Sequence, residues 1–414
     1  MVIMLYWYPY EGPLQPVYGE IFRELMSRGH EMTIITSFPH FRKGRSETWD
    51  EYRGRLLEIS DWNGARLIRS YVYGPVFDQN KSGLLYRALN FISFNISCLI
   101  AGLFRGGKAD IIFAPSSPPL TNGICAWLLS LWKRSRVVYN VQDMYPDMAE
   151  KLELIRSKMV LYLLRGVERL VYRLSDRLFV LSDAMKQNIM KKGVPATNIV
   201  VIPNPVNTEF IRPLPRNNRF SKRWGLDGHF VVMYAGNVGL PHGTEVIIQA
   251  AEVLKNAPGI LFCFVGRGEY RHTIEKLAEV KRLDNVIFIP PQPEEEVPNI
   301  WASASVSLVT YRKGLSEDSV PSKLLAIMSS GRPVIGAVDE ESEAYRIIKM
   351  ARCGLCVEPE NPDALAGAIV HLKQNKARRK DMGSRGRDYV IRHCKTSVIS
   401  SQYEEAFLSS SVTG

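Results

Sequence analysis

Short apolar runs rich in β-branched residues alternate with helical patterns along the whole chain, and this alternation limits the possible folds more than any other feature. Residues 2–8 and 31–36 are two such runs, and the apolar residues between Val17 and Met26 fall on one face of a helix. Further runs lie at 111–114, 137–140, 178–181 and 199–202. Strands that alternate with helices predict βαβ units and a parallel sheet.

The same rhythm restarts after residue 205, with runs at 230–235, 260–265, 286–289, 306–310 and 333–335. Residues 202–220, rich in Pro and Asn, separate the halves and are typical of a hinge or linker. We therefore predict an α/β protein of two Rossmann-like parallel-sheet domains, 1–203 and 204–385, facing a cleft. Binding loops would follow the carboxyl ends of both sheets. A final helix at about 386–410 is expected to pack back onto the first domain.

Composition favours an ordinary globular protein, because 46% of the residues are hydrophobic and 23% are charged. The six cysteines are too few for a disulfide scaffold. The chain opens on a strand-like run without the features of a signal peptide, so we expect a cytoplasmic protein. The CxxC pair Cys353–Cys356 has no second pair or nearby His, which favours a structural role over a metal site.

The net charge of +11 is concentrated in the first half, where residues 1–200 hold 26 Lys and Arg against 18 Asp and Glu. This excess indicates an anionic partner: a phosphorylated substrate, an anionic membrane surface or nucleic acid. Nucleic acid is less attractive, because no recognition motif accompanies the basic residues. A solvated basic face chosen for solubility is the alternative.

The segment Ala88–Phe104 carries no charge and lies between Arg87 and Arg105. Its 17 residues are at the lower limit for a spanning helix, and its two Asn and two Ser argue against spanning. A buried core helix and a helix lying at the membrane interface both remain open. In the second case nearby basic residues would meet anionic head groups, namely Lys108, Lys133, Arg134 and Arg136.

Residues 317–335 form the most informative segment. Ser322 can cap a helix that begins at Lys323, and an exposed helix N-terminus beside a lysine is suited to a diphosphate. Glu317 and Asp318 precede it, where carboxylates could accept hydrogen bonds from sugar hydroxyls. An ordinary capped helix with a surface lysine is the alternative.

Two further segments follow predicted strands. The glycines of 236–239 and 266–268 indicate close approach of the backbone to a ligand, although their spacing does not fit a dinucleotide fingerprint. Residues 139–152 gather polar side chains where substrate is often handled, namely Asn140, Gln142, Asp143, Tyr145 and Asp147. Asp143 could equally be a helix cap.

Taken together, these segments resemble the family-4 retaining glycosyltransferases with the GT-B fold. The likeness is greatest to bacterial enzymes of capsule, colanic-acid and O-antigen synthesis, including the N-acetylfucosamine transferase group. It spans nearly the whole chain, through segments such as YNVQDMYPDMAEKL, VVIPNPVNTEF, VVMYAGNVG, LFCFVGRGE and SVPSKLLAIMSSGRPVI.

The resemblance assigns roles to named residues. It places Asn237 and Gly239 near the donor diphosphate, and Arg267 near the nucleotide. Pro291 and Gln292 would border the base. Lys323 and Ser322 would address the donor phosphates and sugar together with Glu317 or Asp318, while Gly12 would face the diphosphate and Asp143 the reacting sugar. This sequence departs from the family pattern at several positions. Asn237 and His242 stand where many family members have Arg and Lys. The Glu-x7-Glu pattern, counted from Glu317, has Leu325 in place of its second Glu, and Gln142 stands where the family often has His.

The resemblance also implies transfer of a sugar, with retention, from a nucleotide diphosphate sugar, here expected to be UDP-linked. The acceptor would be lipid-linked or a glycan in polysaccharide or lipopolysaccharide synthesis. It implies no metal and no cofactor, no nucleic-acid partner, and an enzyme peripheral on the inner face of the cell membrane. A nucleotide-sugar 2-epimerase of the same fold and a non-catalytic basic binder of membrane or nucleic acid are the alternatives.

Overall fold

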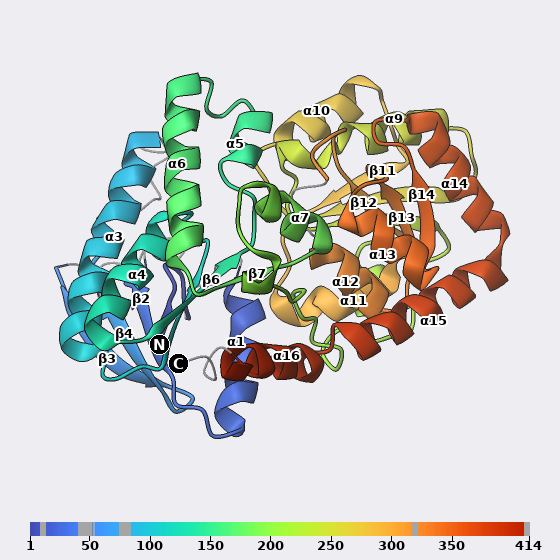
Figure 1. Ribbon diagram of the computed structural model, residues 1–414. Helices are drawn as coiled ribbons and strands as arrows, with labels where there is room; N and C mark the ends of the chain where they lie inside the picture. The colour runs from blue at the N-terminus through green and yellow to red at the C-terminus, as the bar shows by residue number, and fades with distance from the viewer. Residues whose placement is uncertain (9–13, 40–51, 53, 74–83, 317–321, 410–414) are drawn as a thin grey trace. The chain divides into compact units, whose positions relative to one another are not determined.

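The computed structural model describes the chain except for residues 9–13, 40–51, 53, 74–83, 317–321 and 410–414. The chain folds into two compact units (Figure 1). The first comprises Met1–Pro203 and Ile399–Gly414, and the second comprises Asn204–Val398. Each unit is built on its own β-sheet, so the prediction of two parallel-sheet α/β units is confirmed.

The first sheet has the strand order β3-β4-β2-β1-β5-β6-β7-β8. Neighbouring strands are parallel except for the antiparallel pair β3 and β4. Strand β1 is shorter than the predicted run at 2–8. The bounds are β1 Val2–Ile3, β2 Thr33–Ser37, β3 Leu57–Trp62, β4 Ala65–Ser70, β5 Ile111–Pro115, β6 Arg136–Val141, β7 Arg177–Val180 and β8 Ile199–Val201.

The β3–β4 hairpin was not predicted, although the sequence contains its signal. Asn63 and Gly64 form the two-residue turn with φ angles of 50° and 90°. A turn with both central residues at positive φ matches the twist of the flanking strands, and Asn-Gly is the pair that adopts it most readily. Strand β3 of this hairpin is the edge strand of an otherwise parallel sheet.

Helices cover both faces of the first sheet. Aromatic side chains of α1 and α16 pack on Phe113 and Phe179 at one face. At the other face α4 lies between α3 and α6, and a Cβ added to Gly123 of α4 would lie only 2.4 Å from Val171 of α6. The bounds are α1 Gln15–Ser27, α3 Leu84–Arg105, α4 Thr121–Lys133, α5 Asp147–Lys151, α6 Lys158–Leu174, α7 Asp183–Lys191 and α16 Thr396–Ser409.

Helix α3 contains the predicted uncharged segment, and it is not enclosed by the fold. Among the described residues, its stretch Ala88–Arg105 is long and apolar enough to cross a membrane, yet only 28% of that stretch is buried. The alternative of a buried core helix is therefore wrong for this segment.

The second sheet is entirely parallel, with the order β11-β10-β9-β12-β13-β14. The chain winds from central β9 outward to β11, then crosses to β12 and winds outward in the other direction. Strand β14, which contains Cys356, was not predicted. The bounds are β9 Phe230–Ala235, β10 Ile260–Val265, β11 Val286–Ile289, β12 Val306–Thr310, β13 Val334–Ala337 and β14 Gly354–Val357.

Eight α-helices are described in the second unit, and two core clusters lie on the two faces of its sheet. Their bounds are α8 Arg219–Arg223, α9 Glu245–Val253, α10 Arg271–Val280, α11 Val297–Ser303, α12 Ser322–Ser329, α13 Glu343–Ala351, α14 Pro362–Gln374 and α15 Lys376–His393.

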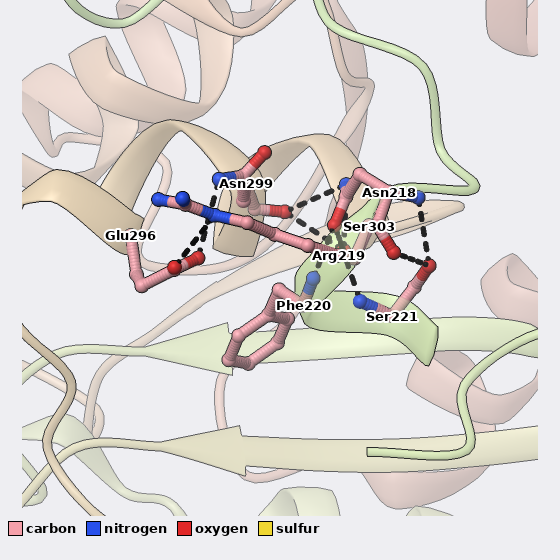
Figure 2. A network of polar contacts seen from close by, with 7 residues as sticks. All are labelled: Asn218, Arg219, Phe220, Ser221, Glu296, Asn299 and Ser303. Carbon is pink, nitrogen blue, oxygen red and sulfur yellow. Dashed lines mark hydrogen bonds and ion pairs between the residues drawn. The ribbon is translucent and has the colours of Figure 1, made fainter. Parts of the chain in front are cut away.

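Most of the predicted linker 202–220 is fixed to the second unit. Figure 2 shows Asn218 capping α8 and donating through Nδ2 to the Asn299 carbonyl (3.2 Å) and to Ser303 Oγ (3.1 Å) of α11. Upstream, the Val206 N–H donates to the Cys394 carbonyl at 2.8 Å. A hinge, if the chain uses one here, is therefore confined to the few residues before Val206.

The C-terminal part differs from the predicted single helix over 386–410. Helix α15 ends at His393 and α16 begins at Thr396, and the unit boundary falls after Val398. Residues 386–398 thus belong to the second unit, and only α16 packs on the first sheet. The break is needed because the two helices contribute to different cores: Val390 to the second unit and Tyr403 to the first.

Candidate active site

Four loops gather at the carboxyl edge of the second sheet, beside the point between β9 and β12 where the winding direction changes. Such a switch point is where open α/β sheets bind ligands. The loops after β9, β10 and β11 contain the predicted residues Asn237, Arg267 and Gln292. The chain after β12 leads into α12, whose second residue is Lys323.

The glycines at this edge serve loop packing. A Cβ at Gly266 would lie 2.2 Å from the Gly236 carbonyl oxygen, and one at Gly268 would lie 2.1 Å from the Val238 carbonyl oxygen. The Val238 N–H also donates to the Arg267 carbonyl at 2.8 Å. Only glycine permits this backbone contact, so the predicted approach to a ligand is not needed to explain Gly266 and Gly268.

Lys323 lies over the end of β9. Its Nζ donates to the Tyr234 hydroxyl at 2.8 Å and lies 4.1 Å from the centre of the Tyr234 ring. The buried Tyr234 hydroxyl in turn donates to the Asn237 carbonyl at 2.8 Å. One aromatic residue therefore holds both the lysine and the turn that follows β9. Tyr234 was not predicted, because a tyrosine in a buried strand resembles core.

The lysine has no described carboxylate within ion-pair distance, and burial lowers its pKa to about 7. Its side chain is partly exposed at the surface, so solvent still reaches it from one side. A partly desolvated ammonium without a counter-ion attracts an anion strongly. This is the electrostatic property expected of a phosphate-binding group.

His242 lies beside this lysine but carries no charge near neutral pH. Burial and the positive charge of Lys323 lower the pKa of the imidazole to about 3. The Gly239 N–H donates to His242 Nδ1 at 3.3 Å, which leaves the ring proton on Nε2. His242 can therefore donate one hydrogen bond to a ligand, but it cannot supply the charge of the lysine expected at this position in many family members.

The remaining predicted donor residues differ in where they lie. Asn237 and Arg267 are exposed in the loops after β9 and β10, Pro291 is exposed in the loop after β11, and Ser322 is exposed at the first position of α12. Gln292 donates to the Pro290 carbonyl at 2.9 Å, so its amide is partly used within its own loop. Glu317, Asp318 and Gly12 lie outside the described residues.

Asp339, which follows β13, was missed by the sequence reasoning. Its carboxylate accepts hydrogen bonds from the Gly314 N–H at 3.0 Å and from Ser316 Oγ at 2.5 Å. These bonds fix the residues just before Glu317 and Asp318. The available signal was an aspartate four residues after the predicted strand at 333–335, at the same sheet edge as Lys323.

Polar residues at the end of β6 and in the loop after it form two groups, one that is used in packing the first unit and one that is accessible. Tyr18 donates to Asn140 Oδ1 at 2.6 Å and accepts from Gln142 Nε2 at 2.8 Å, and Asn140 Nδ2 donates to Tyr403 at 3.2 Å. All four side chains are buried. Asn140 and Gln142 thus join α1, β6 and α16, so the prediction that they handle substrate is not supported.

Asp143 and Asp147 also differ in role. Asp147 pairs with Lys192 at 2.8 Å, which makes it structural. The Asp143 residue is exposed, yet surrounding protein atoms desolvate its carboxyl and raise its pKa. Asp143 therefore remains available to a ligand of the first unit.

All six cysteines are free thiols, and burial raises the pKa of Cys353 and of Cys356 to about 12, which fits the structural role predicted for them. Within the part of the chain that is described, no group of three or more His, Cys, Asp or Glu side chains could hold a metal ion.

Two units built on parallel sheets, each with polar loops at its carboxyl edge, define the class of doubly wound α/β proteins. Comparison with models of protein families identifies the family. Residues 14–205 match the glycosyl transferase 4-like domain, and residues 217–389 match glycosyl transferases group 1. The chain belongs to the glycosyltransferases that combine these two domains. This confirms the predicted enzyme class over the epimerase and the non-catalytic binder.

Relatives and solved structures agree with this assignment. The chain is 27% identical to WcaI of Escherichia coli, named as a colanic acid biosynthesis glycosyl transferase, over 85% of this chain and 86% of that protein. It is 27% identical to the glycosyltransferase WbjE of Pseudomonas aeruginosa, over 70% and 72%.

Two solved structures show the same GT-B fold. HepE of Anabaena, crystallised with UDP, has a TM-score of 0.72 at 14% identity, covering 99% of both chains. Sucrose-phosphate synthase of Thermosynechococcus elongatus has a TM-score of 0.76 at 18% identity, covering 99% of this chain and 98% of that one.

Proposed function

We propose that this glycosyltransferase moves a sugar from a nucleotide diphosphate sugar to a lipid-linked or glycan acceptor in the synthesis of a cell-surface polysaccharide. The likeness to WcaI, a glycosyl transferase of colanic acid biosynthesis, supports the pathway class, and the UDP in the HepE crystal makes UDP the first nucleotide to test. The acceptor would place the enzyme on the cytoplasmic side of the membrane, as a peripheral protein.

The observation that carries the proposal is the ammonium of Lys323 at the switch point of the second sheet, which has no carboxylate partner among the described residues. A diphosphate at this edge would meet Lys323, the N–H groups at the start of α12 and the Nε2 proton of His242. It would restore to the lysine the counter-ion that the described residues do not provide.

The chemistry follows from this placement. As the bond from the sugar C1 to the β-phosphate oxygen breaks, negative charge grows on the leaving diphosphate. A preorganised ammonium stabilises that charge without having to move. We propose that the leaving oxygen takes the proton of the acceptor hydroxyl on the same face of the sugar, so that the configuration is retained. Lys323 would supply the positive charge, so this scheme needs no metal or other cofactor.

The other assignments rest on the resemblance and remain proposals. Asn237, Gly239 and His242 would serve the diphosphate, and Arg267 the nucleotide. Pro291 and Gln292 would border the base, with Ser322 at the phosphates. Asp143, Glu317, Asp318 and Gly12 would face the donor sugar or diphosphate.

Binding and turnover test the proposal separately. A thermal-shift panel with UDP, GDP, TDP and ADP identifies the base. In the Lys323→Ala variant we expect the shift to disappear and kcat to fall by roughly 10²–10³-fold, the effect of losing a charge-stabilising donor. Lys349→Ala is the matched control, because Lys349 also lies over a tyrosine ring, Tyr345, at 5.3 Å. An unchanged kcat in Lys323→Ala would remove Lys323 from the mechanism.

The glycosyltransferase also makes a prediction that an epimerase does not. Nucleoside diphosphate should be released from the donor only when an acceptor is present. Release of the same nucleotide without any acceptor, at the same rate, would contradict transfer.

A further inference from the structure

Helix α3 exposes an apolar stripe to solvent. Its exposed residues recur every three or four positions along one side of the helix, and they are Leu89, Ile92, Ile96, Ile100 and Phe104. Ile96 is 57% exposed, Ile100 53% and Phe104 78%, whereas Phe94 and Cys98 are fully buried. The helix therefore packs on the fold with one apolar side and leaves a second apolar side uncovered.

The neighbouring helices extend this stripe. Figure 1 shows α3, α4 and α6 together over the first sheet, and α4 contacts both of the others. The C-terminal turn of α4 exposes Leu131 and Trp132, the latter by 78%. Helix α6 exposes Met159, Tyr162, Leu163 and Leu170. We call the exposed apolar residues of α3, α4 and α6 the three-helix face.

Charge beside the α3 and α4 part of this face is almost entirely positive. From residue 84 to residue 142 the sequence has one acidic residue, Asp110, and six basic ones: Arg87, Arg105, Lys108, Lys133, Arg134 and Arg136. Arg105 and Lys133 end α3 and α4, so they lie beside the exposed Phe104 and Trp132. On α6 the exposed Arg169 and Arg173 flank Leu170.

We propose that the three-helix face binds the surface of an anionic lipid bilayer, with α3 lying along the membrane plane. Aliphatic side chains would enter the head-group region, Trp132 and Tyr162 would sit at the interface, and the basic residues at the helix ends would meet lipid phosphates. Apolar patches with basic residues at the ends of α3 and α4 fit a fluid anionic surface better than a protein partner, which would offer its own apolar pocket and acidic groups in fixed positions.

The proposal deepens the proposed function, because a lipid-linked acceptor is reached from such a surface, but vesicle binding does not require activity. The test is co-sedimentation with vesicles of phosphatidylcholine and phosphatidylglycerol, and with phosphatidylcholine alone. The variant is Ile96→Asp with Ile100→Asp. The control is Val253→Asp with Val280→Asp, which changes two apolar residues of the second unit that are 53% and 73% exposed.

We expect the full-length protein and the control to sediment with the anionic vesicles and much less with the neutral ones. Each isoleucine that leaves water contributes about one to two powers of ten in partitioning, so the Ile96 and Ile100 variant should bind at least about 100-fold more weakly. Trp132 offers an independent signal: vesicles should shift its fluorescence to the blue, and this component should be missing in Trp132→Phe.

Three results would overturn the proposal. In the first, the isoleucine variant sediments with the anionic vesicles like the unchanged protein. In the second, the Val253 and Val280 control loses vesicle binding equally. In the third, the unchanged protein does not bind vesicles and instead forms a dimer, and the isoleucine substitutions dissociate that dimer. Nucleoside diphosphate binding is measured on every variant. If it persists while vesicle binding is lost, the three-helix face is separated from the donor site; if it is absent throughout, the proposed function fails and the membrane proposal does not.

Discussion

Affinity for a nucleotide sugar should fall as pH rises through neutrality, because Lys323 changes charge there. In the free protein burial holds the pKa of this lysine at about 7. A bound diphosphate favours the charged form and raises that pKa, so binding takes up a proton above neutral pH. His242 contributes no such change, because its pKa of about 3 keeps the imidazole neutral throughout.

The size of the effect follows from the fraction of lysine that is charged. If only the ammonium binds the diphosphate, Kd is doubled at about pH 7, rises about 10-fold at pH 8 and about 100-fold at pH 9, relative to its acidic limit. Folding stability moves in the opposite direction. The charged form is disfavoured in the folded state, so this lysine costs stability below pH 7, and that cost disappears as pH rises toward the unfolded pKa of about 10.4.

The assay is isothermal titration with the nucleotide sugar whose base gives the largest thermal shift, between about pH 6 and pH 8.5 at constant ionic strength. The diphosphate diester of a nucleotide sugar has no proton that titrates in this range, so the signal belongs to the protein. Lys323→Arg keeps its charge and should show a flat profile. The reasoning is refuted if the unchanged protein is as flat as that variant.

Three further predictions concern the groups that support the site. Tyr234→Phe keeps the ring under Lys323 but removes the hydroxyl that accepts a hydrogen bond from its ammonium. The pH at which nucleotide-sugar affinity has fallen by half should therefore move about one pH unit lower. If this pH does not change, the hydroxyl does not stabilise the charged lysine. Gly268→Ala forces a Cβ against a backbone carbonyl, so the free energy of unfolding, measured by urea titration, should fall by about 1–3 kcal/mol. Gly166→Ala is the control, because Gly166 has open space around it and this change should not destabilise the protein. Equal losses in the two variants would contradict the packing argument. Asn218→Ala removes the cap of α8 and its bonds to α11, and should cost about 1–2 kcal/mol in the same titration; a neutral result would mean that the linker is not anchored there.

Much of the fold could be predicted because strands and helices have different periods and the parallel sheets bury nearly continuous apolar runs. The β3–β4 hairpin was not predicted because β3 alternates exposed and partly buried residues and β4 includes Arg66 and Arg69, so no apolar run marked either strand. Its Asn63–Gly64 turn was the signal that should have been used.

The candidate site was harder to predict, since side chains of the same type have different partners. Asn140 ends the predicted strand and Gln142 and Asp143 follow it closely, but only the structure shows that Tyr18 and Tyr403 use the hydrogen-bonding groups of Asn140 and Gln142. In α3 apolar residues occur on both sides of the helix, so periodicity could not tell Phe94, which is buried, from the exposed Ile96. That distinction depends on which neighbours α3 packs against.

The return of α16 to the first unit has a consequence for synthesis. Tyr403 and Phe407 complete an aromatic cluster around Phe113 and Phe179, and Tyr403 bonds to Asn140. These partners are separated by more than 200 residues of chain, including the entire second unit. A nascent chain on the ribosome can therefore finish its second unit before its first, and the early unit waits with a bare hydrophobic face until the last residues emerge.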